Sequence, residues 1–246
     1  MSRGPLPARL AIYFHALEAP DYGAFRECFE DLLARGYVAS TPEAFLSGSE
    51  RALFISFDDN YASWHRCLPF LDDLGVKATF YVNTLPMRGK CHAATLARYF
   101  DRIAHVGERV PLSAAEICEM RSAGHTIGCH SHSHFVLSQL PRGEWDAEIR
   151  RSKELLEDLL GEAVPHFSYP YGMRRFFTRA LADYCYSIGF QSIASGIPGL
   201  QMAPLARGPL LHRTRWNLDR PLAHNIADLE IDGRLFESLT GRSAVG

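Results

Sequence analysis

The sequence lacks the features that define several classes of protein. It has no C-x-x-C pair, no internal repeat, no low-complexity tract, and no apolar run long enough for a membrane span or a signal-peptide core. Neither sign of charge dominates, because 26 basic residues are interspersed with 28 acidic ones. Since nucleic-acid backbones bind to basic surfaces, we expect no nucleic-acid partner. We also expect no membrane span and a cytoplasmic location, whereas the oligomeric state is left open.

The cysteines form no disulfide or metal-binding framework. A chain of 246 residues can bury a sizeable core without covalent cross-links, so we expect reduced thiols. Cys129 lies next to His130, but neighbouring side chains of a strand point to opposite faces, so the two should not share a site. The six cysteines are Cys28, Cys67, Cys91, Cys118, Cys129 and Cys185.

Apolar runs of strand length alternate with longer segments of helical periodicity, which is typical of a parallel sheet. Strands are predicted at 10–15, 52–57, 78–82, 126–129, 166–169, 191–195 and 210–213. Helices are predicted at 22–35, 62–74, 95–104, 142–160 and 174–188. A further helix begins at the capping box of Ser113 and Glu116 and ends before Gly124.

This alternation favours a βα barrel, complete or incomplete, over an open doubly wound sheet. The reason is that no Gly-rich phosphate turn follows the first strand. We expect one domain over residues 1–246, with a core at about 10–215 and a C-terminal helical tail at 216–246. The segment 83–111 has a weaker pattern and is interpreted as an elaborated loop above the sheet.

The first group of candidate site residues follows the second predicted strand. Asp58 and Asp59 are adjacent carboxylates at a strand end, where two such charges are costly unless a cation or distinct roles separate their ionisation. An alternative is that Asp58, Asp59 and Asn60 cap the next helix, because Asp and Asn favour that position.

The second group is three histidines within five residues after the strand at 126–129. His130 and His134 can share one face if the chain turns helically there, and neutral imidazoles are good zinc ligands. A carboxylate from elsewhere would complete a two-His-one-Asp set with positions left for water and substrate. His132 should face away. The alternative for a single histidine would be an ordinary buried polar residue.

The third group is the turn after the strand at 166–169. Pro170 and Gly172 fix a tight turn, which leaves backbone N–H groups that can point at an oxyanion. The alternative is an ordinary structural turn between a strand and a helix.

Together the three groups resemble the first three motifs of the polysaccharide deacetylase family, carbohydrate esterase family 4. They are FDD at 57–59, HSHSH at 130–134 and FSYPYG at 167–172, and the resemblance spans about 10–213. It implies a distorted (β/α)7 barrel that hydrolyses an N-acetyl or related N-acyl group of a sugar.

The resemblance also implies roles for particular residues. Asp59, His130 and His134 would hold a divalent metal, usually zinc, with cobalt, nickel or manganese as alternatives. Asp58 would be the general base, and the backbone N–H of Tyr171 would help to hold the oxyanion. One carboxylate bound to a metal stays ionised while its neighbour takes a proton, which agrees with the adjacent pair.

The sequence departs from the family pattern at several positions. Asn60 replaces the usual Gly, and Asn enters left-handed backbone conformations more readily than most residues. Ser168 stands where the family often has an Arg that orients the catalytic Asp, and Arg213 is the candidate replacement, unless it pairs with a surface carboxylate. His212 is the nearest candidate for the general acid.

We place His15, Asn60, Pro170 and Arg213 around a carbohydrate substrate, which could be an N-acylated sugar, a nucleotide sugar or a glycan intermediate. Two other functions remain open: a catalytically impaired carbohydrate-binding barrel, and a metal-dependent hydrolase of another non-peptide C–N bond. Fold alone does not separate these three.

Overall fold

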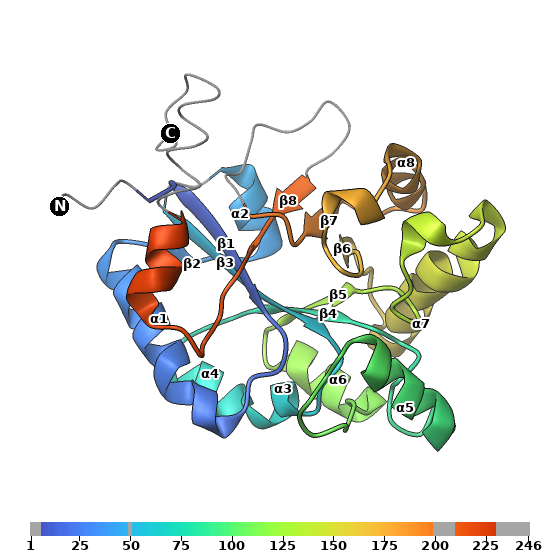
Figure 1. Cartoon of the computed structure of the whole chain (residues 1–246), viewed down its shortest axis with the longest axis horizontal. Coiled ribbons are helices and arrows are strands. Elements are labelled where there is room, and N and C mark those ends of the chain that lie inside the picture. The colour runs from blue at the N-terminus through green and yellow to red at the C-terminus, as the bar shows by residue number, and fades with distance from the viewer. Residues whose placement is uncertain (1–5, 49–50, 199–209, 230–246) are drawn as a thin grey trace.

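Every strand pairing in the computed structural model is parallel, and the strands form one curved sheet (Figure 1). The structure describes residues 6–48, 51–198 and 210–229. The order across the sheet is β8-β7-β6-β5-β4-β3-β1-β9, and β2 pairs with β3. The strands are β1 (Arg9–Phe14), β2 (Val38–Ala39), β3 (Ala52–Asp59), β4 (Thr79–Val82), β5 (Thr126–Cys129), β6 (His166–Ser168), β7 (Ser192–Ser195), β8 (Leu210–His212) and β9 (Thr214–Arg215).

The two edges of this sheet are consecutive in the chain. Strand β8 ends at His212 and β9 begins at Thr214, so Arg213 alone joins one edge of the sheet to the other. The sheet must therefore curl until its edges almost meet, which confirms the predicted distorted barrel. It also places Arg213 at the seam of that barrel.

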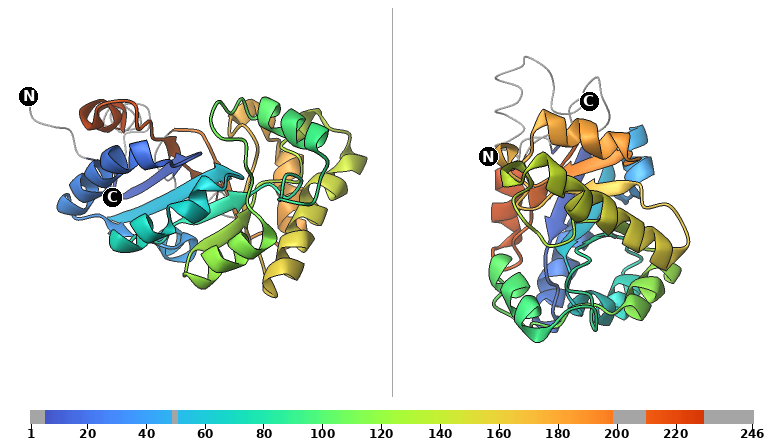
Figure 2. Two further views of the ribbon diagram at one scale, coloured as in Figure 1. Left: turned by 90° about the horizontal axis from the view of Figure 1, so that it is seen from below. Right: turned by 90° about the vertical axis from the view of Figure 1, so that its right-hand side faces the viewer.

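Helices cover the outside of the strands (Figure 2). The prediction for 62–74 was too long: this segment forms two short helices, and Pro69 lies in the first turn of the second. The predicted helix at 142–160 begins with a 3-10 turn and a π turn at Asp146–Arg150 before it becomes α-helical, and it ends at the left-handed Gly161. The helices are α1 (Tyr22–Ala34), α2 (Pro42–Ser47), α3 (Ser63–Arg66), α4 (Leu68–Asp73), α5 (Ala93–Arg102), α6 (Ala114–Ser122), α7 (Arg151–Leu160) and α8 (Arg179–Ser187).

Within the helical tail predicted at 216–246, residues 222–229 form a helix and residues 216–221 do not. Residues 230–246 lie outside the described residues. The predicted capping box is present, since the Ser113 hydroxyl accepts from Glu116 N–H and the Glu116 carboxylate accepts from Ser113 N–H. No helix of the described residues is long and apolar enough to cross a membrane.

The apolar side chains form two clusters, one on each face of the sheet. The larger lies between the strands and the outer helices and contains Phe57, Phe80 and Cys129. The smaller fills the barrel interior and contains Phe54, Tyr81 and Leu211. All six cysteines are free thiols. The side chain of Cys129 faces the helices and lies 3.3 Å from the Ser152 hydroxyl, away from His130 as predicted.

Candidate active site

The adjacent carboxylates Asp58 and Asp59 lie at the C-terminal end of β3 and point in different directions. Asp58 lies four residues after Phe54 on the same strand, so its side chain points to the same face, the barrel interior that Phe54 lines. Asp59 has a φ of 90°, and this left-handed backbone re-aims its side chain toward the end of β5. Neither carboxylate caps a helix, because α3 begins after Ala62 without a side-chain cap.

Asn60 is fully buried, and its amide bonds to backbone groups rather than facing a ligand. Its Nδ2 donates to the carbonyl of Asn83, and its Oδ1 accepts from Leu112 N–H at 2.7 Å. The left-handed residue of this turn is Asp59, whereas the sequence interpretation assigned that conformation to Asn60.

His130 and His134 converge on Asp59, but the chain between them does not turn helically as the sequence analysis assumed. Ser131 and His134 have left-handed φ values of 66° and 62°, and the Ser131 hydroxyl accepts from His134 N–H. This turn brings both imidazoles to one side. His132 faces away, as predicted, and its Nδ1 lies 2.8 Å from the Thr84 hydroxyl.

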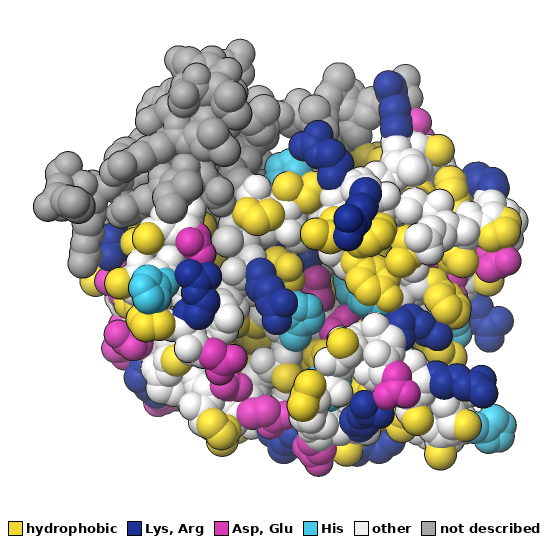
Figure 3. Space-filling view, viewed as in Figure 1, with side chains coloured by type: hydrophobic (Ala, Val, Ile, Leu, Met, Phe, Trp, Pro, Cys, Tyr) yellow, Lys and Arg dark blue, Asp and Glu magenta, His cyan; other side chains and the backbone are white. Residues whose placement is uncertain are grey.

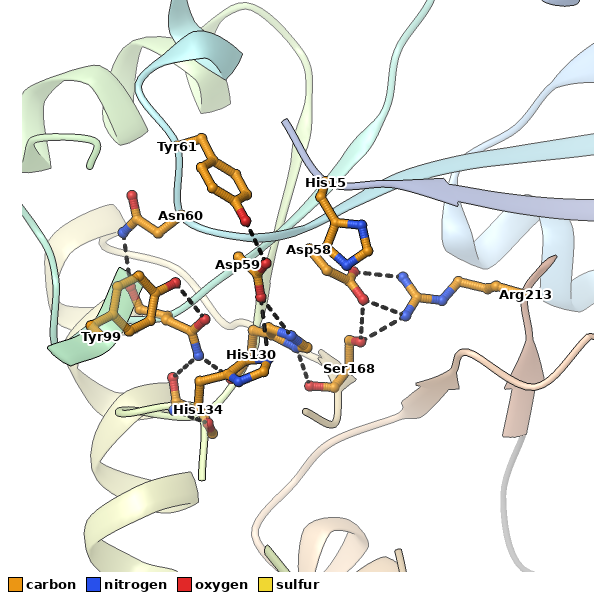
Figure 4. A network of polar contacts seen from close by, with 12 residues as sticks. His15, Asp58, Asp59, Asn60, Tyr61, Tyr99, His130, His134, Ser168 and Arg213 are labelled. Carbon is orange, nitrogen blue, oxygen red and sulfur yellow. Dashed lines mark hydrogen bonds and ion pairs between the residues drawn. The ribbon is translucent and has the colours of Figure 1, made fainter. Parts of the chain in front are cut away.

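The spacing of these three side chains fits a divalent metal (Figure 4). Asp59 Oδ1 lies 3.5 Å from His130 Nε2 and 3.2 Å from His134 Nε2. Tetrahedral zinc, with bonds of about 2.1 Å, separates neighbouring ligand atoms by about 3.4 Å. His130 Nδ1 lies 2.7 Å from the Ser168 carbonyl, which accepts a hydrogen bond from Nδ1–H and so leaves Nε2 as the ligand atom.

The electrostatics of the same residues favour a cation. Burial raises the pKa of Asp59, but its hydrogen bonds with His130 and His134, together with the charges of nearby histidines, outweigh burial and hold that pKa well below the usual range. Burial lowers the pKa of His130, but the charges of Asp58 and Asp59 outweigh it and raise that pKa. Asp59 is therefore ionised, and the nitrogens that surround it form a set typical of zinc.

Arg213 reaches Asp58 from the barrel seam and binds it with two parallel hydrogen bonds. Nη1 and Nη2 each donate to one oxygen of Asp58 at 2.7 Å. The other donors reach the Ser195 carbonyl and the hydroxyls of Ser56 and Ser168, so all five guanidinium N–H groups have partners. Arg213 is fully buried, so the alternative of a surface ion pair is wrong.

This arrangement sets the ionisation of Asp58. Burial raises the pKa of Asp58, but the positive charge and hydrogen bonds of Arg213, together with the nearby histidines, outweigh burial, and the pKa is lowered. The Ser168 hydroxyl also donates to Asp58 at 3.1 Å, so the Ser at this position belongs to the same network. Asp58 is thus held in one orientation as a carboxylate.

The turn at 169–172 places a backbone N–H beside the metal-binding residues. Tyr171 has a left-handed φ of 65°, and its ring lies 4.7 Å from the ring of His134. Within the described part of the chain, Tyr171 N–H has no hydrogen-bond acceptor. Gly172 is required at the next position, because a Cβ there would lie 2.5 Å from the backbone nitrogen of Gly196.

Backbone strain is concentrated at this site. The described residues other than glycine with positive φ include Asp59, Ser131, His134 and Tyr171, which all belong to the candidate site. Such conformations cost about 1–3 kcal/mol each and persist where the surrounding structure holds them. The strain therefore supports a functional role for this region.

A cavity of about 270 Å³ opens at the C-terminal ends of the strands and contains most of the predicted site residues. Its walls include Asp58, Asp59, His130, His134 and Tyr171. They also include His15, at the end of β1.

Four predicted residues do not line this cavity. Arg213 is fully buried at the barrel seam and contacts Asp58, so it does not line the space predicted for the substrate. Pro170 is buried within its turn. Asn60 holds two backbone segments together, as described above. His212 lies at the end of β8, where its Nδ1 is 2.9 Å from the Ser195 hydroxyl.

Sequence reasoning missed three residues that hold the metal-binding groups in place. The Tyr61 hydroxyl donates to Asp59 at 2.8 Å. The amide of Asn83 donates to the carbonyls of His130 and Ser131. The buried carboxylate of Glu148, in the π turn, accepts from both the backbone N–H and the hydroxyl of Ser133. Asn83 follows β4 directly, and that position at a strand end was the available signal.

Residues 46–192 match the polysaccharide deacetylase family. The chain therefore belongs to the polysaccharide deacetylase family. It is 27% identical over 172 residues to YxkH of Bacillus subtilis (strain 168), which carries the provisional name of a polysaccharide deacetylase. That match covers 67% of this chain and 54% of YxkH, so the chain spans about half the length of this curated relative.

Two solved structures share the fold. The deacetylase PplD of Streptococcus pyogenes, in complex with acetate, has a TM-score of 0.68 at 17% identity and covers 91% of this chain and 99% of its own. IcaB from Ammonifex degensii has a TM-score of 0.69 at 19% identity and covers 91% of this chain and 97% of its own. At these identities the similarity concerns the barrel architecture.

Proposed function

We propose that this protein hydrolyses the N-acetyl or related N-acyl group of a carbohydrate substrate. One observation carries the proposal: Asp58, fixed by Arg213, lies beside the converging groups of Asp59, His130 and His134 in one cavity. This arrangement combines a positioned base with a metal site, the two parts that hydrolysis of an amide requires.

Asp59, His130 and His134 would hold a divalent metal. Zinc fits best, because the ligands are two imidazoles and one carboxylate at tetrahedral spacing, whereas cobalt, nickel or manganese are the alternatives. When bound, such a metal would lower the pKa of water and polarise the acyl carbonyl. The carbonyl of Ser168 and the hydroxyl of Tyr61 orient His130 and Asp59 for this purpose.

Asp58 and Tyr171 act on the reacting atoms. Asp58 takes the proton from the attacking water, and its two hydrogen bonds from Arg213 keep the carboxylate facing that water. Tyr171 N–H donates to the oxyanion as the carbonyl carbon becomes tetrahedral, because a free N–H at a rigid turn needs no reorganisation.

His15 is a better candidate than His212 for the general acid that donates a proton to the leaving amine. It lines the cavity and lies beside Asp58 in Figure 4. Burial lowers the pKa of His15, with partial compensation from the charges of Asp59 and Asp58. A weakly basic imidazole is a strong donor once it is protonated, and Asp58 can pass on the proton that it takes from water.

The family and the cavity favour a sugar amide over the two other functions that the sequence left open. Ser168 suggested an impaired enzyme, but the contacts of Arg213 supply the missing orientation of Asp58. If the protein is cytoplasmic, which stays a prediction from the sequence, soluble or lipid-linked sugars fit better than a mature cell-wall polymer.

The test is acetate or formate release from a panel of N-acylated sugars, with chelator and with added zinc. We expect turnover that requires metal. Asp58→Asn should keep metal and fold but lose about 10²- to 10⁴-fold in turnover. His15→Asn should lower turnover, whereas His212→Asn serves as its control. Release from simple amides but from no sugar would favour the other C–N hydrolase, and metal-loaded protein without turnover would favour the impaired barrel.

A further inference from the structure

Arg215 is a cation at the mouth of the catalytic cavity that has no partner in the described part of the chain. It lies on β9, where its backbone pairs with Tyr13 of β1. Thr214 and Trp216, on either side of it, are buried, and strand alternation sends the Arg215 side chain the other way, to the cavity wall. No described residue accepts a hydrogen bond from its guanidinium, and no described carboxylate lies in ion-pair range.

The other arginines near the site are engaged. Arg213 uses all five donors within the barrel, as shown above. Arg102, which also lines the cavity, donates through Nη1 to the carbonyl of Ser133, and its guanidinium lies 3.9 Å from the centre of the Phe135 ring. Of the two arginines that line the cavity, Arg215 is therefore the one with no hydrogen bond, ion pair or ring contact to any described residue.

Charged side chains of both signs line the cavity. Figure 3 shows Lys and Arg side chains at the sides of the hollow on this face, with acidic side chains inside it. The two carboxylates inside the cavity already have partners, because Asp58 forms an ion pair with Arg213 and Asp59 belongs to the metal-binding group. The field of Arg215 still reaches Tyr13 and His15 on the cavity wall.

We infer that the substrate carries an anionic group, a phosphate or a carboxylate, that Arg215 binds at the mouth of the cavity. An arginine fork matches the oxygens of either group, and it is weakly hydrated compared with an ammonium. This inference rests on the proposed function and narrows its substrate class to acidic N-acylated sugars.

The size of the cavity limits where the charge can lie on the substrate. Its volume of about 270 Å³ is near the lower limit of about 300 Å³ for common ligand pockets. Arg215 and the catalytic group of Asp58 line this one small space. An anionic group on the acylated sugar itself, or directly attached to it, can therefore reach Arg215 while the acyl group lies at Asp58.

The experiment compares four substrates that differ in charge: N-acetylglucosamine, its 1-phosphate, its 6-phosphate and N-acetylmuramic acid, which carries a carboxylate. Acetate release is measured for the wild type, Arg215→Gln and a matched control, Arg220→Gln. Arg220 also lies in the C-terminal segment and is exposed, but it pairs with Asp228 and does not line the cavity. Both variants remove one positive charge.

We expect Arg215→Gln to lower kcat/KM for at least one acidic sugar by about 10- to 100-fold, the usual value of a charge-assisted hydrogen bond. The neutral sugar should change little, and Arg220→Gln should match the wild type on all four. The acidic sugars that lose rate distinguish phosphate from carboxylate. Equal losses on neutral and acidic sugars, or no loss on any, would overturn the inference.

A binding measurement separates this inference from the proposed function. In the Asp58→Asn background, calorimetry with the same acidic sugars reports binding without turnover. Affinity that falls by about 10-fold or more when Arg215→Gln is added supports the inference even if no variant releases acetate. Affinity that does not depend on Arg215 overturns it, whether or not the neutral sugar is hydrolysed.

Discussion

Replacement of Arg213 by Met tests the network around Asp58 most directly. The substitution keeps an unbranched apolar side chain between the rings of Tyr13 and Tyr81, which lie 4.7 and 5.1 Å from the guanidinium. It removes both hydrogen bonds to Asp58, whose carboxylate then stays buried with the Ser168 hydroxyl as its remaining partner among the residues described. Loss of one partner of a buried ion pair costs about 3–5 kcal/mol of unfolding free energy.

The same change should move the pH dependence of the reaction. Burial raises the pKa of Asp58, and Arg213 is the main influence that lowers it. Without Arg213 the pKa of Asp58 should rise, because burial is then opposed by fewer positive charges and hydrogen bonds. Protonated Asp58 cannot accept a proton, so the acid limb of the kcat/KM profile should shift to higher pH.

The stability effect has a defined pH window. The lowered pKa of Asp58 stabilises the folded state above the unfolded Asp pKa of about 3.9, and this stability is lost as the pH falls through the folded value. Chemical denaturation should thus show the full loss at neutral pH and a smaller one in acid. In Arg213→Met/Asp58→Asn, part of the loss should be recovered, because no buried charge is left unpaired.

Arg213→Lys and Arg220→Met are the controls. Lysine keeps the charge without the two parallel bonds, so its acid limb should lie between those of the wild type and Arg213→Met. Arg220→Met removes an exposed arginine and should behave as the wild type. A folded, metal-loaded Arg213→Met protein with an unshifted acid limb would show that Arg213 does not control the ionisation of the base.

Three further predictions concern metal and stability. His134→Ala should lose most of its metal, since two remaining ligands form a poor site, and full occupancy by elemental analysis in both this variant and Asp59→Ala would exclude the ligand set. Glu148→Ala should weaken zinc affinity by about 10- to 100-fold, because it removes the hydrogen bonds that hold the loop between His130 and His134. The control Glu144→Ala, at an exposed position, should bind zinc as the wild type does. Equal affinities of the two variants in a zinc titration would contradict this. Burial lowers the pKa of His125 to about 4, so the unfolding free energy should fall by about 2 kcal/mol as the pH decreases from 6.5 to 4. His125→Asn should show a smaller decrease, and identical pH profiles of the variant and the wild type in denaturation experiments would refute this prediction.

Much of the architecture follows from local signals in the sequence. Strand β5 occurs at the predicted residues, and Gly36 and Gly75 are left-handed after helices that the sequence placed before them. Such signals depend on side-chain periodicity and backbone preferences within a few residues. The helix predicted at 142–160 shows the limit: a periodic apolar stripe does not reveal the π turn in which Glu148 holds the histidine loop.

The sequence by itself also determined which residues could form the site. Three motifs at strand ends identified Asp58, Asp59, His130, His134 and Tyr171, and all five line one cavity. The physical reason is that the C-terminal ends of parallel strands share one edge of the barrel, so residues far apart in sequence meet there.

Only the tertiary structure decided which polar residues reach that cavity. His15 lies on the cavity wall. His212 instead lies within hydrogen-bond distance of the Ser195 hydroxyl, and the Asn60 amide bonds to two backbone segments. Position in the sequence did not distinguish them, because orientation at a strand end depends on single backbone angles and on the neighbouring strand. The pairing of Arg213 with Asp58 is a consequence of barrel closure, which brings residues 155 positions apart within hydrogen-bond distance.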